Sequence, residues 1–105
     1  MELNEIQNKI KEFVSKRKWQ HYHNPKNLSM SIAIESAELM EHFQWLSFEE
    51  IEELIKNKQT LKKISEELAD VMIYCLSLAN ALKIKADKAI LDKLNKNEKR
   101  FKIKS

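Results

Sequence analysis

Residues 61–82 read LKKISEELADVMIYCLSLANAL, and this stretch is the strongest indicator of the fold. It contains no glycine or proline and is rich in Leu, Ala, Glu and Lys, which favour helix. Its apolar residues recur at helical spacing, whereas Glu67, Asp70 and Tyr74 fall on a separate polar stripe with Lys63 and Ser77. We therefore expect one long helix with an acidic stripe beside an apolar side.

The rest of the chain belongs to the same structural class. Its 105 residues include no glycine and a single proline, Pro25. Folds rich in β-turns need glycine at many positions, so we expect an all-α bundle of about five helices in a single domain spanning residues 1–105. Helical spacing predicts helices at about residues 3–17, 28–45, 48–56, 61–82 and 86–101. The expected N-caps are Asn27, then Ser47 in a capping box with Glu50, then Thr60.

A second pair of carboxylates, Glu35 and Glu38, has the three-residue spacing of Glu67 and Asp70. Residues three apart share a helix face. Apolar residues flank this pair on both sides, which fits an acidic seam inside a bundle better than a solvated face, although a single such pair in a highly charged chain is usually surface. Two facing pairs could place four carboxylates around one point, where they repel one another unless cations lie among them. All-oxygen ligation indicates Mg²⁺, with Mn²⁺ as the alternative, and hence metal-assisted phosphate chemistry.

Several aromatic side chains are candidates for contacts with a nucleobase. Trp19 and His23 lie in a polar loop, Trp45 follows the second predicted helix, and Tyr74 lies on the long helix. Aromatic rings can stack on a base, and the Tyr74 hydroxyl could bond a base or a sugar. The alternatives are that the tryptophans cover an end of the bundle and that Tyr74 is a core residue.

Three polar residues of the last predicted helix, Lys93, Asn97 and Arg100, share one face. A lysine, an amide and a guanidinium in a row can hold a polyphosphate, although a solvated face is the default for so charged a helix. The net charge of +3 and the basic C-terminal region could also indicate nucleic-acid binding. We do not expect nucleic acid as a partner, because the acidic seam would repel its backbone.

The cellular setting follows from cysteine usage and hydropathy. Cys75 is the single cysteine, so no internal disulfide can form, and a reducing, cytoplasmic compartment is expected. The first residues, MELNE, do not resemble a signal peptide. The longest apolar run, residues 71–82, is interrupted by Ser77 and Asn80, so no membrane span is expected.

In this order and spacing, the motifs resemble the all-α nucleoside triphosphate pyrophosphatases of the MazG-like superfamily. The arrangement ExxE, a spacer and ExxD in a helical chain carries the resemblance. It is nearest to the dCTP pyrophosphatase branch, through Trp19 and through HNPKNL at residues 23–28, FQW at 43–45 and EELADV at 66–71. One departure is Ile10, which aligns with a histidine in the first helix of that branch.

The resemblance implies a four-helix core completed by a second copy, in a homodimer or homotetramer. By sequence pattern, Ile32, Phe43, Val71 and Leu78 are candidates for burial against that copy. The resemblance also implies Mg²⁺ bound by the four acids and phosphate contacts from Lys93, Asn97 and Arg100. It further implies contacts to the nucleobase from the residues that match Trp19, Trp45 and Tyr74.

The implied activity is hydrolysis of a (deoxy)nucleoside triphosphate, with dCTP or a modified analogue as a candidate, to the monophosphate and pyrophosphate. The alternative left open is a non-catalytic helical oligomer that binds nucleotide or metal. A di-iron bundle fits less well, because it needs Glu-x-x-His pairs.

Overall fold

The structure is a computed structural model that describes residues 1–103 and folds them into helices without a strand. The helices are α1 (Leu3–Lys16), α2 (Pro25–Glu41), α3 (Phe48–Lys56), α4 (Lys58–Ala81) and α5 (Ala86–Arg100). The all-α prediction is therefore confirmed. None of these helices combines the length and the apolar character needed to cross a membrane.

Side-chain hydrogen bonds at the helix starts explain most of the boundaries. The predicted capping box of α3 is present: the Glu50 amide donates to Ser47 Oγ at 3.2 Å, and the Ser47 amide donates to Glu50 Oε1 at 3.1 Å. α4 begins at Lys58 because Asn57, and not the predicted Thr60, is its N-cap. Asn57 Oδ1 accepts hydrogen bonds from two successive backbone amides, at 3.0 and 3.1 Å, so the helix starts earlier than expected.

The predicted boundaries of α2 were wrong at both ends. Its N-cap is Asn24 and not Asn27, since Asn24 Oδ1 accepts from the Asn27 amide at 2.9 Å. Pro25 takes the first helical position, where the missing N–H needs no partner. At the other end the helix stops at Glu41 and residues 42–45 form turns, so Trp45 is not helical.

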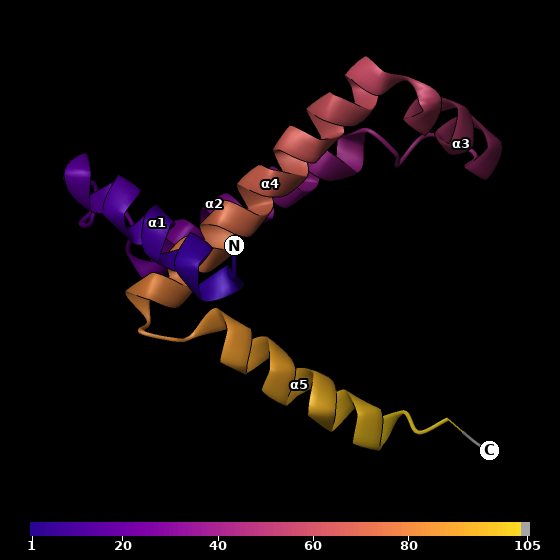
Figure 1. The fold of residues 1–105 in the computed structure, drawn as a ribbon. Helices are drawn as coiled ribbons and strands as arrows, with labels where there is room; N and C mark the ends of the chain where they lie inside the picture. The colour runs from indigo at the N-terminus through magenta and orange to yellow at the C-terminus, as the bar shows by residue number, and fades with distance from the viewer. Residues whose placement is uncertain (104–105) are drawn as a thin grey trace.

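α2 and α4 pack along each other and form the main helix pair of the chain (Figure 1). α2 runs outward to α3, which contacts α4, and α4 returns alongside α2 (Figure 1). α1 packs on α4 toward the opposite end. α5 contacts α1 and then runs away from the α2–α4 pair as a separate arm (Figure 1).

A buried glutamine of α1 fixes the start of that arm. Gln7 Nε2 donates to Asn80 Oδ1 at 2.9 Å and to the Ile84 carbonyl at 2.8 Å, while Asn80 Nδ2 donates to the Gln7 carbonyl at 3.1 Å. Gln7 Oε1 accepts from the Ala86 amide at 3.1 Å. Lys85, the N-cap residue of α5, makes no side-chain cap, so Gln7 supplies an acceptor from a distant helix. These bonds tie together α1, the end of α4 and the beginning of α5.

The isolated chain leaves an unusually large surface exposed. Its solvent-accessible area is 8923 Å². A compact monomer of its mass, 12.5 kDa, exposes about 6,200 Å², which leaves an excess of about 2,700 Å². The excess is consistent with the small core, whose buried hydrophobic residues are Val14, Leu28, Ile64 and Ala86.

The exposed apolar residues differ from those expected to face a second copy. Large hydrophobic side chains remain exposed on α2, α4 and α5, among them Ile34, Leu68, Met72, Ile90, Leu91 and Leu94. The residues predicted for that role, Ile32, Phe43, Val71 and Leu78, are already half-buried within the chain. The exposed apolar surface is therefore wider than those four positions.

Candidate functional site: an acidic seam and a neighbouring cavity

The four acids of the predicted seam lie on α2 and α4, where Glu35 and Glu67 are half-buried and Glu38 and Asp70 are exposed. Glu35 and Glu38 are one helical turn apart on α2, and Glu67 and Asp70 are one turn apart on the adjoining α4. Burial raises the pKa of the half-buried Glu35 carboxyl, and the negative charges of Glu38, Asp70 and Glu67 raise it further. The charges of the other three acids therefore act on the Glu35 carboxyl.

One of these acids has a partner that the sequence did not assign to it. His42, the residue that follows α2, contacts the Glu67 carboxylate through Nε2. Both side chains are largely shielded, with 22% and 24% of their surface exposed. A hollow of about 430 Å³ adjoins the pair and is lined by Glu38, Glu41, His42, Lys63 and Glu67. His42 therefore holds one oxygen of Glu67 at the edge of the seam.

The donor atoms of the seam fit Mg²⁺ or Mn²⁺ by their chemistry. Carboxylate oxygens are the preferred ligands of both ions, and mutual repulsion favours a cation among them. Within residues 1–103, however, no three His, Cys, Asp or Glu side chains are close enough to hold one ion as they stand. The seam therefore has the right donors, and its side chains would have to reorient to ligate a metal.

The candidate aromatic residues are distributed unevenly around the seam. Tyr74 is half-buried on α4, one turn beyond Asp70. Trp19 is 41% exposed, with its ring 5.8 Å from Phe13 in an edge-on arrangement and 6.3 Å from His23 with the two planes only 23° apart. Trp45 is 85% exposed in the turns after α2. Trp19 thus packs against Phe13 of α1, whereas the side chain of Trp45 is almost fully exposed.

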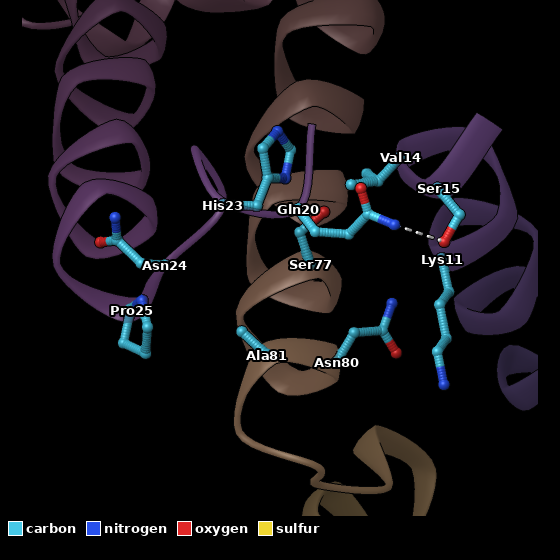
Figure 2. A pocket seen from close by; sticks show the side chains of 10 residues that line it. All are labelled: Lys11, Val14, Ser15, Gln20, His23, Asn24, Pro25, Ser77, Asn80 and Ala81. Atoms are coloured by element: carbon cyan, nitrogen blue, oxygen red, sulfur yellow. Dashed lines mark hydrogen bonds between the residues drawn. The ribbon is translucent and has the colours of Figure 1, made fainter. Parts of the chain in front are cut away.

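A cavity of about 340 Å³ lies between α1, the turns before α2 and the last turns of α4 (Figure 2). His23 and Gln20 reach over it from the turns, and Ser77 and Asn80 line it from α4 (Figure 2). Gln20 Nε2 donates to Ser15 Oγ at 3.1 Å on the α1 side. Within the described residues, the buried Ser77 Oγ and His23 Nδ1 have no hydrogen-bond partner. Sequence reasoning placed Ser77 on the acidic stripe but gave it no role.

The candidate phosphate ligands on α5 are not brought to the acids within one chain. Lys93 and Asn97 line a small hollow along α5 itself, together with Ala89, Ile90 and Leu94. The Arg100 guanidinium lies 5.0 Å from the centre of the Phe101 ring. Because α5 runs away from α2 and α4 (Figure 1), these three residues and the acidic seam lie on separate arms of the molecule.

Comparison with known proteins places this arrangement in a family. The profile of the MazG-like family matches residues 30–105, which include both carboxylate pairs. dCTP pyrophosphatase 1 from Bos taurus is 32% identical over 101 residues, covering 96% of this chain and 60% of the relative. The Homo sapiens protein of the same name is 32% identical over 99 residues, covering 94% of the chain and 58% of the relative. The chain therefore spans about three-fifths of the length of these curated relatives.

A solved structure agrees with the sequence comparisons. The crystal structure of a pyrophosphatase from Archaeoglobus fulgidus superposes with a TM-score of 0.83 at 40% identity, covering 94% of this chain and 91% of that one. The resemblance noted in the sequence, to the superfamily and to its dCTP pyrophosphatase branch, is thereby confirmed. This chain belongs to the MazG-like family.

Proposed function

We propose that the protein hydrolyses a nucleoside triphosphate to the monophosphate and pyrophosphate, with Mg²⁺ or Mn²⁺ as cofactor. The observation that carries the proposal is the seam of four carboxylates on two packed helices, in a chain of the MazG-like family. Repulsion between neighbouring carboxylates destabilises a fold when no positive charge offsets it. Such a cluster is therefore typical of a functional site that binds cations. The similarity to proteins named pyrophosphatase supports this reaction class.

Glu35, Glu38, Glu67 and Asp70 are the residues that would hold the metal. A bound Mg²⁺ or Mn²⁺ would supply positive charge for the triphosphate oxygens and make water a stronger nucleophile. The carboxylates orient what they bind from two rigid helices, which favours precise placement of the reacting groups. One of them, or the neighbouring exposed Glu66, would accept the proton of the attacking water.

Binding of the base and sugar would fall to the aromatic end of the site. Tyr74 lies between the seam and the cavity on α4, and Trp19 and His23 border the same region. dCTP, or an analogue modified on its base, is the first substrate to test, because the curated relatives carry that name. The free and exposed Cys75 suits a reducing compartment such as the cytoplasm.

Assembly into a homodimer or homotetramer belongs to the same proposal. The excess exposed area, about 2,700 Å² per chain, is more than three times the roughly 800 Å² that each partner buries in a standard interface. Lys93, Asn97 and Arg100 could then contact the phosphates bound at another copy's seam, since they do not reach the seam of their own chain. Cationic groups of this kind would neutralise charge on the departing pyrophosphate.

A product assay tests the reaction directly. The protein is incubated with a panel of NTPs and dNTPs, with Mg²⁺ and with EDTA, and pyrophosphate and orthophosphate are measured separately. We expect Mg²⁺-dependent release of pyrophosphate with the nucleoside monophosphate. Orthophosphate with a nucleoside diphosphate would show that a different bond is cleaved, and tight nucleotide binding without turnover would favour a non-catalytic oligomer.

A further inference from the structure

We propose that Ser77 is a specificity-determining residue that hydrogen-bonds the edge of the nucleobase inside the cavity between α1 and the end of α4. This inference rests on the proposed function for the identity of the ligand, but its evidence is separate from the acidic seam. The evidence is the state of two buried polar atoms, the size of the cavity and the chemistry of its lining.

Ser77 is 5% exposed, and its hydroxyl has no hydrogen-bond partner among the described residues. A serine inside a helix usually bonds the carbonyl four residues earlier or turns to solvent, and Ser77 does neither. His23 lines the same cavity, and its Nδ1 is also buried without a partner. Two such atoms on one cavity are unusual, because buried polar groups in folded proteins are nearly always paired.

A single water is too small to account for this cavity. Its volume is about 340 Å³, whereas one water takes up about 30 Å³ of liquid. Cavities of this size fall in the range that holds small organic ligands. The cavity therefore has room beside Ser77 and His23 for a ligand larger than water.

The lining favours a neutral heterocycle over a metal or a phosphate. It contains no carboxylate and one cationic residue, Lys11; the other polar groups are hydroxyl, amide and imidazole groups. The amide groups of Gln20, Asn24 and Asn80 already take part in hydrogen bonds within the chain. The Ser77 hydroxyl and the His23 imidazole are therefore the groups left to pair with a donor or acceptor on the edge of a base. The Trp19 ring beside His23, with nearly parallel planes, offers an aromatic surface at the border of the cavity.

The position along α4 agrees with this assignment. Ser77 lies seven residues beyond Asp70 on the same stripe, which is about 10 Å along the helix axis. Tyr74 lies between them. One nucleotide could therefore place its phosphates at the seam and its base at Ser77.

The test uses nucleosides without phosphate or metal, so that it does not depend on turnover. Thymidine and deoxycytidine are titrated into ¹⁵N-labelled protein, together with the deoxynucleoside of difluorotoluene, which has the shape of thymidine with little hydrogen-bonding capacity. We expect shifts in the backbone amides of Ser77 and Asn80 and in the ring nitrogens of His23. Thymidine should bind wild type about tenfold more tightly than its apolar analogue.

Three variants separate a hydrogen bond from a structural role. Ser77→Ala should lower the affinity for thymidine about tenfold, so that thymidine and its apolar analogue bind equally well. Ser77→Thr keeps the hydroxyl and should retain part of the preference for thymidine over the analogue. Ser65→Ala, at an exposed serine on the same helix, should behave as wild type. Absence of shifts in the cavity residues with every nucleoside, or an unchanged preference in Ser77→Ala, would overturn the inference. Loss of triphosphate hydrolysis with these shifts intact would instead count against the proposed function alone.

Discussion

Replacing Gln7 by leucine should destabilise the fold and release α5 from α1. The change removes three hydrogen bonds made by the side chain, to Asn80, to the Ile84 carbonyl and from the Ala86 amide. At about 1 kcal/mol net for each bond, the expected loss of unfolding free energy is about 2–3 kcal/mol, with partial recovery where the freed groups reach water. Because Gln7 is 6% exposed, most of that recovery is blocked.

Urea unfolding followed by circular dichroism measures this loss, at one fixed protein concentration because assembly would couple stability to concentration. Asn8→Leu, at the exposed neighbouring position of α1, is the matched control and should change stability by no more than about 0.5 kcal/mol. Hydrogen exchange adds a local measurement: the Ala86 amide should exchange faster in Gln7→Leu, while amides in α2 keep their protection. If Gln7→Leu is as stable as wild type and its Ala86 amide still exchanges slowly, Gln7 does not anchor the start of α5.

The seam makes two related predictions. Asp70→Asn or Glu38→Gln should lower Mg²⁺-dependent turnover by roughly a hundredfold or more without unfolding the protein. The control Glu52→Gln, on α3, should leave turnover unchanged, and near-normal turnover in either seam variant would contradict the metal assignment. In EDTA, Glu35→Gln should raise the melting temperature at neutral pH, because the raised pKa of Glu35 means that the fold disfavours the charged form of this side chain. The gain in melting temperature should vanish as the pH falls below the ordinary pKa range of glutamate, and a gain that does not depend on pH would argue against this cause. Light scattering should find two or four times the chain mass of 12.5 kDa, and a fully active monomer would contradict a shared site.

Interactions within a few residues were the most predictable from sequence. The Ser47 and Glu50 capping box was predicted because both partners lie within one turn and have a recognisable pattern. The start of α2 was misplaced because Asn24 and Asn27 are both good caps, and Pro25 was interpreted as part of a loop. Proline at the first helical position decides between them, since it loses no hydrogen bond there.

Long-range contacts could not be predicted in the same way. Gln7 and Asn80 are 73 residues apart, and a lone glutamine in a charged helix reads as a surface residue. Helical spacing likewise predicted that α5 is a helix, but it did not predict in which direction α5 runs relative to α2 and α4. That direction depends on hydrogen bonds between α1 and the end of α4, which exist only once those two helices have packed.

The proposed assembly would explain both the separation of the candidate site residues and the large exposed surface. The chain places its acids on α2 and α4 and its candidate phosphate ligands on α5, and Gln7 holds α5 away from the pair. A flexible arm could fold back onto its own seam, but an arm anchored by buried hydrogen bonds at its base cannot do so without breaking them. The apolar side chains left exposed on that arm, including Ile90, Leu91 and Leu94, also require cover. In a symmetric oligomer, each arm would be covered by another copy and would bring Lys93, Asn97 and Arg100 toward that copy's phosphates, so the proposed catalysis would depend on assembly.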